Sequence, residues 1–123
     1  ARAPLAAFNV ELEGADREEA EAVAALVRES GGGPPGVRAM AIDLGEGRMQ
    51  ISTNIHDPGV ITLGNVVDVV RRHAREHGAT PTQAELVGLV PAAALDHYPE
   101  DVPIIGTDPR RRTIEAHLDA LRG

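Results

Sequence analysis

Short polar side chains occupy alternate positions in several extended runs of this sequence, and they are its clearest candidates for ligand recognition. In the run 48–55, Gln50, Ser52 and Asn54 would share one face of a strand, and apolar residues would take most of the other face. Amides can donate and accept hydrogen bonds, and a carboxylate can accept from ring N–H groups. The residues that we predict to contact a ligand are Asn9, Ser52, Asn54 and Glu85.

His73, Glu76 and His77 form the string H-x-x-E-H, which occurs in one class of zinc peptidases. Histidines at positions i and i+4 share a helix face and can hold Zn²⁺ together. The sequence places no third ligand, and His77 next to Gly78 also suits a helix end, where the helix dipole favours an imidazole. We therefore predict a structural helix terminus and no metal site.

The glycine-rich segment 31–36, GGGPPG, is a candidate phosphate-binding loop by composition alone. Phosphate loops lead into a helix N-terminus, whereas this segment follows a predicted helix, so we interpret it as a helix stop and chain reversal. Ser30 and Ser52 lie outside any G-x-S-x-G elbow, and nothing supports a hydrolase triad. We predict no catalytic residue in this chain.

Three consecutive arginines, Arg110 to Arg112, begin the last predicted helix. Positive charge at that position opposes the helix dipole, and runs of this kind are usually solvated. The alternative is a contact with an anion, such as the carboxylate tail of a ligand.

Composition excludes several functions. The 123 residues have a net charge of −7 and no lysine, so a nucleic-acid partner is not expected. Phe8 and Tyr98 are the only aromatic residues, which leaves no stacking platform for bases. No cysteine is present, which is consistent with a cytoplasmic location, and no membrane span or secretory signal is visible. Because the sequence begins with Ala1, we expect that an upstream segment was removed.

Periodicity and capping signals place the elements. The expected strands are 5–13, 37–44, 48–55 and 80–91. The expected helices begin at Asp16, Thr62 and Asp108 and end near Ser30, His77 and Leu121. Between the last strand and the last helix we expect one helical turn over 92–96 and an irregular stretch over 99–107. The last helix would place Ile114, Leu118 and Leu121 on its inner side.

This order predicts one α+β domain over residues 1–123, a ferredoxin-like βαββαβ sandwich with a C-terminal helix. Both crossover helices would cover one face of a four-stranded antiparallel sheet and leave the other face open. From the last strand, either Glu85 and Val87 or Leu86 and Gly88 would lie on the open face, and the strand register decides between them.

Four segments resemble, in order and spacing, the C-terminal subdomain of glutamate formiminotransferase. They are AFNVEL (7–12), VRESGGGPPGVRAMAI (27–42), QISTNI (50–55) and AELVGLVP (84–91), and the closing GTDPRRRTIEAHL (106–118) fits more loosely. The sequence departs from the family pattern at Thr53 and His56, and the segment between Pro91 and Gly106 is short and proline-rich.

The resemblance implies a role in one-carbon metabolism and histidine degradation. Members transfer a formimino group from N-formimino-L-glutamate to N5 of the co-substrate tetrahydrofolate, in some organisms on the same polypeptide as a cyclodeaminase. Two α/β subdomains face each other with the folate between their sheets, so the open face would be half of a folate cleft. The catalytic histidine belongs to the N-terminal subdomain, which would be the partner of this chain. No histidine here matches that motif, so we expect this chain alone to be inactive.

Other interpretations fit the same topology. One is a regulatory module that dimerises through its sheets and binds a small amino acid, and a second is a non-catalytic docking domain. A homodimer through the open sheet face is a further alternative. An RNA-recognition domain would need aromatic residues on its central strands and a basic face, and Gln50, Ile51 and Ser52 provide neither.

Overall fold

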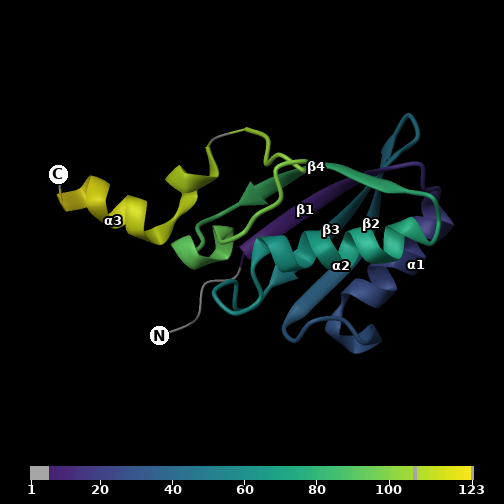
Figure 1. Ribbon diagram of the computed structural model, residues 1–123, viewed down its shortest axis with the longest axis horizontal. Helices are drawn as coiled ribbons and strands as arrows, with labels where there is room; N and C mark the ends of the chain where they lie inside the picture. Colours follow the sequence, from purple (N-terminus) through teal and green to yellow (C-terminus); the bar gives the residue numbers. More distant parts are fainter. Residues whose placement is uncertain (1–5, 107, 123) are drawn as a thin grey trace.

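A four-stranded antiparallel sheet is the framework of the protein, whose computed structural model describes residues 6–106 and 108–122 (Figure 1). Its strands are β1 (Ala6–Glu13), β2 (Val37–Gly45), β3 (Arg48–Ile55) and β4 (Thr80–Val87), in the spatial order β2-β3-β1-β4. Helices α1 (Arg17–Val27) and α2 (Leu63–Arg75) make the two crossovers and cover the same face. The predicted ferredoxin-like βαββαβ arrangement is confirmed.

Both crossover helices begin with a capping box. In α1, the Asp16 carboxylate accepts from the Glu19 backbone N–H at 2.8 Å, and the Glu19 carboxylate accepts from the Asp16 N–H at 3.1 Å. In α2, Thr62 and Asn65 make the equivalent pair at 3.2 and 3.0 Å. Each box satisfies two N–H groups that a helix start otherwise leaves unpaired. The caps predicted at Asp16 and Thr62 are confirmed.

The turn between β2 and β3 consists of Glu46 and Gly47, whose φ angles are 56° and 77°. Two consecutive positive φ angles are typical of the two-residue hairpin turns whose twist matches that of the strands. Asp43 supports the turn by accepting a hydrogen bond from the Gly45 N–H at 2.8 Å. This tight turn sets the register of β2 on β3.

The core lies between the sheet and the helices, where the inward residues of each strand alternate with residues that face away from the helices. Phe8, Leu12, Ile51 and Ile55 are fully buried there. Thr53 is the polar exception, and its hydroxyl donates to the Phe8 carbonyl. That bond explains how a threonine is accommodated on the buried side of β3.

Residues 88–106, the closing segment, extend the core beyond the two helices. Tyr98 packs edge-on against Phe8 with ring centroids 6.2 Å apart, and its hydroxyl donates to the Val102 carbonyl at 2.7 Å. Burial of the Tyr98 phenol raises its pKa above the ordinary value. The guanidinium of Arg71 in α2 donates two hydrogen bonds to the Asp101 carboxylate, at 2.7 and 3.0 Å. This pair connects the closing segment to α2.

The last strand ends earlier than the sequence predicts. We expected it to run to Pro91, but β4 stops at Val87 because Gly88 has a φ of 93°, which no regular strand tolerates. Pro81 lies opposite Leu12, where the register of β1 and β4 shifts. A short helical turn follows at Ala92–Leu95, as expected.

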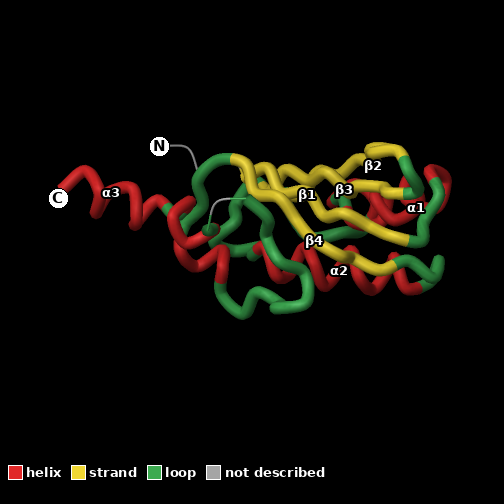
Figure 2. Tube along the Cα trace, turned by 90° about the horizontal axis from the view of Figure 1, so that it is seen from above, coloured by secondary structure: helices red, strands yellow, loops and turns green. Residues whose placement is uncertain are grey.

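The C-terminal helix is present, but its predicted inner side is wrong. Residues Pro109–Arg112 form a 3₁₀ turn, and α3 (Ile114–Arg122) begins anew after the Thr113 hydroxyl accepts from the Ala116 N–H at 3.1 Å. In Figures 1 and 2, α3 projects from the body. Leu118 and Leu121 are therefore 48% and 82% exposed instead of buried.

Two further expectations change in detail. Helix α2 ends at Arg75, and His77 is half-buried with its Nδ1 3.7 Å from the Glu19 carboxylate, so it does not belong to the buried stripe of that helix. The predicted first strand begins at Leu5, and the predicted irregular stretch ends at Thr107. Leu5 and Thr107 lie outside the residues that the structure describes.

Candidate ligand-binding face

The sheet surface that faces away from α1 and α2, here called the open face, is a grid of cross-strand rows. The middle row consists of Met40, Ser52, Asn9 and Glu85, one residue from each strand. The row toward the end of β3 consists of Arg38, Asn54, Ala7 and Val87. The row toward the hairpin consists of Ile42, Gln50, Glu11 and Gln83.

The four residues predicted as ligand contacts are neighbours on this open face. Asn9 pairs with Ser52 on one side and with Glu85 on the other, and Asn54 lies in the adjacent row. The register also decides between the alternatives on β4, because Glu85 and Val87 are exposed while Leu86 is buried. A ligand lying across the sheet could therefore reach side chains from several strands at once.

Asn9, in the middle row, carries an unsatisfied polar atom. Its Oδ1 is buried and has no hydrogen-bond partner within the described residues. A buried acceptor without a donor costs free energy comparable to a lost hydrogen bond, and each such group in a folded protein requires an explanation.

Glu11, in the row toward the hairpin, is by contrast hydrogen-bonded within the chain through one carboxylate oxygen. Its Oε1 accepts from Arg48 at 3.1 Å and from the Gln83 side-chain amide at 3.4 Å, and the residue is 9% exposed. Glu11, Arg48 and Gln83 are thus joined to one another at the hairpin end of the open face. Asn54 and Glu85, in the other two rows, are exposed.

Strand β2 gives the open face an apolar border that the sequence analysis missed. Met40 is 60% exposed, and Ile42 and Leu44 are each 37% exposed. Their alternation with Ala39 and Ala41 was the available signal, since β2 must present its outward residues on the same face as Gln50 and Ser52 of its hairpin partner β3. This border is suited to contact with another apolar surface.

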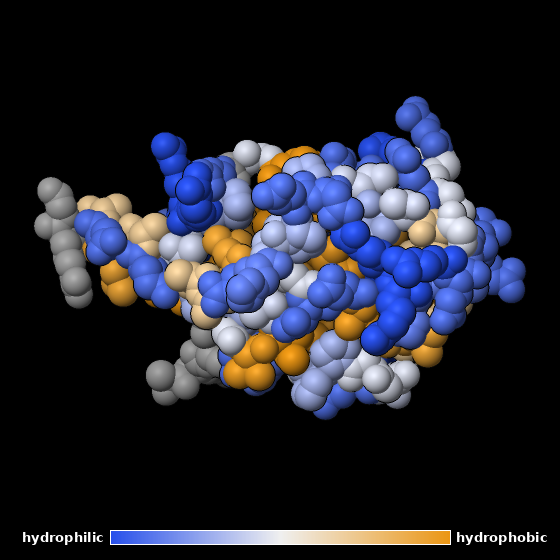
Figure 3. Space-filling model, viewed as in Figure 1, coloured by the Kyte–Doolittle hydropathy of each residue, from blue (hydrophilic) through white to orange (hydrophobic). Residues whose placement is uncertain are grey.

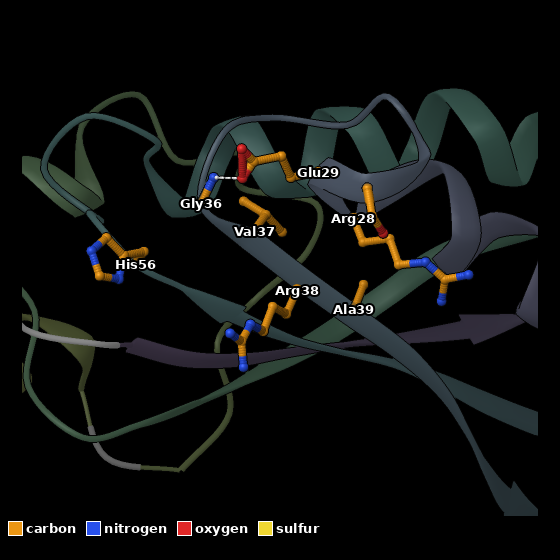
Figure 4. A pocket seen from close by; sticks show the side chains of 8 residues that line it. Arg28, Glu29, Gly36, Val37, Arg38, Ala39 and His56 are labelled. Carbon is orange, nitrogen blue, oxygen red and sulfur yellow. Dashed lines mark hydrogen bonds between the residues drawn. The ribbon is translucent and has the colours of Figure 1, made fainter.

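A hollow of about 200 Å³ lies at the end of the open face where β3 ends, lined by Gly36, Arg38, Asn54 and His56. A larger hollow of about 840 Å³ wraps around the edge strand β2 and reaches Arg28 and Glu29. Figure 4 shows Arg38 on one side of the β2 ribbon and Arg28 and Glu29 on the other. Arg38 was also absent from the sequence predictions.

The glycine-rich segment 31–36 serves the fold. The N–H groups of Gly31, Gly32 and Gly33 donate to backbone carbonyls of residues 28 and 29 at 2.9–3.0 Å, and the Gly36 N–H donates to the Glu29 carboxylate at 2.8 Å. These N–H groups are consumed and cannot hold a phosphate. The predicted helix stop and chain reversal is confirmed.

The remaining motifs form no assembled site. Within residues 6–106 and 108–122, no group of three or more histidine, aspartate or glutamate side chains is arranged to hold a metal ion. The Arg110 guanidinium donates to both carboxylate oxygens of Asp108, at 3.2 and 3.4 Å. This contact keeps the pKa of the Asp108 carboxyl below its usual value.

The helix-covered side of the molecule is mainly hydrophilic (Figure 3).

Comparison with known proteins identifies the family. The model of the formiminotransferase domain matches residues 7–100. The chain belongs to the formiminotransferase domain family. It is 31% identical to the glutamate formimidoyltransferase of Streptococcus pyogenes over 120 residues, 96% of this chain and 40% of that enzyme. It is 38% identical to the rat formimidoyltransferase-cyclodeaminase over 102 residues, 77% of this chain and 19% of that protein.

Other relatives share only part of their length with this formiminotransferase domain. It is 33% identical to the Holliday junction branch migration complex subunit RuvB of Nocardia farcinica over 119 residues. The match covers 97% of this chain and 30% of that subunit. The chain has no lysine, so it has no phosphate-loop lysine. The chain spans about two-fifths of the S. pyogenes formimidoyltransferase and a smaller share of the others.

In the described part of this formiminotransferase domain, no helix combines the length and the apolar character needed to cross a membrane.

Proposed function

We propose that the open face is the folate-binding half of a glutamate formimidoyltransferase, which transfers a formimino group from N-formimino-L-glutamate to tetrahydrofolate. The observation that carries this proposal is the convergence of Asn9, Ser52 and Glu85 in one cross-strand row of a family member, with the Asn9 Oδ1 left without a donor. The proposal assigns the enzyme to cytoplasmic one-carbon metabolism and histidine degradation.

The chemistry of the face suits a pterin ring. Pterin presents ring N–H and amino donors beside ring nitrogen and carbonyl acceptors. The Glu85 carboxylate can accept from the donors, and the amides of Asn9 and Asn54 can both donate and accept. The aliphatic side chains of Met40 and Val87, at the two ends of these rows, provide apolar contact for the flat ring in the absence of aromatic side chains.

The transfer needs a base that this chain does not supply. N5 of tetrahydrofolate attacks the formimino carbon and loses a proton, while the bond from that carbon to the glutamate nitrogen breaks and the nitrogen gains a proton. A base must lie within hydrogen-bond reach of N5. His73 and His77 lie on or beside α2, His97 in the closing segment and His117 on α3. His56 follows β3 at one end of the open face, beyond the row of Asn54 and two rows from Ser52. We assign the base to a second subdomain that covers the open face.

The second subdomain is the proposed partner, because the apolar border on β2 requires a covering surface. Met40, Ile42 and Leu44 expose apolar area along one side of the polar rows. A sheet facing them would remove that area from water and enclose the folate between two walls. The same arrangement would supply the catalytic base from across the cleft.

Titration of the chain with folinate and with a panel of free amino acids tests the proposal. Saturable folinate binding that shifts the backbone amide resonances of residues 7–9, 52–54 and 85 in ¹H–¹⁵N NMR spectra is the expected result. Binding of an amino acid alone would instead favour the regulatory module. A spectrum unchanged by either would favour the docking domain.

A further inference from the structure

Charge is unevenly distributed over the open face. Glu85 lies on β4, while Arg38 lies on β2 at the opposite edge of the sheet and one row closer to the end of β3. With neighbouring strands about 4.8 Å apart, the Cα atoms of these two residues are separated by roughly 15 Å. A ligand lying diagonally across the sheet would have one end near an acceptor and the other near a cation.

Arg38 is the arginine of this face that is free to bind a ligand. Arg48, also on the open face, is paired with Glu11 at 3.1 Å. Elsewhere, Arg71 is paired with Asp101 and Arg110 with Asp108. Arg38 forms no ion pair with the residues that the structure describes. Its guanidinium can therefore offer its N–H fork to an anion.

The surroundings of Arg38 are built by Gly36 and His56. The His56 N–H donates to the Gly36 carbonyl at 2.8 Å, which joins the start of β2 to the end of β3. Gly36 has a φ of 73°, and a Cβ there would stand 3.0 Å from the His56 Cβ. Glycine thus lets the imidazole and the guanidinium line one hollow. The Glu29 carboxylate, which lines the larger hollow beside β2, already accepts from the Gly36 N–H.

We propose that Arg38, with Asn54 and His56, forms a carboxylate subsite that receives a glutamyl group. This inference rests on the proposed function, in which both substrates carry such a group: the tail of folate and the N-formimino-L-glutamate itself. The guanidinium pairs with the carboxylate in a forked geometry, and the Asn54 amide and His56 imidazole add donors around the same hollow of about 200 Å³. The site orients a ligand whose ring end lies toward Glu85.

Three probes and two variants test this subsite by ¹H–¹⁵N NMR titration of the full chain. Folinate carries the ring and the glutamyl tail, N-formyl-L-glutamate mimics the amino-acid substrate, and 6-hydroxymethylpterin carries the ring without a carboxylate. Arg38→Gln removes the proposed contact while keeping an extended side chain. Arg72→Gln, at an exposed position of α2, makes the same charge change on the opposite side of the sheet.

We expect Arg38→Gln to raise the Kd of a carboxylate ligand about tenfold, as for the loss of a charged hydrogen bond, and to leave the Kd of 6-hydroxymethylpterin unchanged. Arg72→Gln should change neither value. A selective loss for folinate identifies the folate tail as the occupant, and a selective loss for N-formyl-L-glutamate identifies the amino-acid substrate. Either result supports the subsite.

Two results overturn the subsite alone: equal carboxylate affinity in the wild type and in Arg38→Gln, or an equal loss in Arg72→Gln. Both are compatible with folinate binding elsewhere on the open face, so the proposed function would stand. Conversely, N-formyl-L-glutamate binding at Arg38 without any binding of folinate or 6-hydroxymethylpterin would overturn the folate proposal and keep the carboxylate subsite. A wild-type chain that binds none of the three probes overturns both.

Discussion

Asn9 is the residue at which stability and ligand binding should conflict. Because its buried Oδ1 has no partner in the described chain, the amide costs the free protein about 1–3 kcal/mol in lost hydration. We predict that Asn9→Leu increases the free energy of unfolding by about 1 kcal/mol and weakens folinate binding at least about tenfold. Urea denaturation and NMR titration of the same samples measure the two effects.

Gln83→Leu is the matched control on the same face. The Gln83 amide donates to Glu11, so its loss should destabilise the fold slightly, by about 0.5–1 kcal/mol, and leave folinate affinity unaltered. If Asn9→Leu destabilised the protein as much as Gln83→Leu does and left binding intact, the Asn9 amide would be a structural group.

At the residue scale, the sequence was informative where a strand shows its own alternation. Asn9, Ser52 and Asn54 could be placed on one face because their neighbours are apolar and point into the core. Arg38 and Met40 were missed because β2 has small residues at its inward positions, Ala39 and Ala41, which weaken the contrast between faces. Their placement needed the hairpin register, which pairs Arg38 with Asn54.

The segment after α1 is the element whose geometry depends on glycine. A Cβ on Gly33 would stand 2.0 Å from the Val27 carbonyl oxygen, whereas Gly32 has open space around it and a φ of 96°. Gly33→Ala must therefore displace backbone, and we predict a loss of about 2–3 kcal/mol in the free energy of unfolding. Gly32→Ala should lose only about 1 kcal/mol, from its positive φ. Thermal or urea unfolding of both variants compares them.

Equal destabilisation by the two alanines would show that this segment does not pack closely on the end of α1. The comparison also bears on the site, because the segment leads into Gly36 and the hollow beside Arg38. In Gly33→Ala, the backbone resonances of Gly36 and His56 should shift even in the absence of ligand, whereas Gly32→Ala should leave them in place.

At the element scale, the starts of the two crossover helices were predictable, whereas the start of α3 and the end of β4 were not. The capping boxes at Asp16 and Thr62 are local, so the sequence alone locates them. The end of β4 depends on Gly88 adopting a positive φ, and the exposure of Leu118 depends on α3 pointing away from the core. Local periodicity predicts that a helix has an apolar side, but it does not predict what that side contacts.

For the whole molecule, the exposed border of β2 should be where the partner subdomain binds. Met40 is 60% exposed, so Met40→Glu should leave the unfolding transition within about 0.5 kcal/mol of the wild type while it weakens association with that subdomain. The N-terminal part of the S. pyogenes relative, produced separately, is a suitable partner for a binding assay. Leu118→Glu on α3 is the control, because it adds the same charge to an exposed apolar site away from the open face.

In the proposed function, formimino transfer takes place between two walls, of which the open face is one. We predict that this chain with tetrahydrofolate and N-formimino-L-glutamate forms no 5-formiminotetrahydrofolate above the uncatalysed rate, because no histidine of the described residues faces the middle row of the open face. Adding the N-terminal part of the S. pyogenes relative should restore turnover, and Met40→Glu should reduce it more than Leu118→Glu does. Measurable transfer by this chain alone would place the base within it, and His56, at the end of β3, would then be the first residue to substitute.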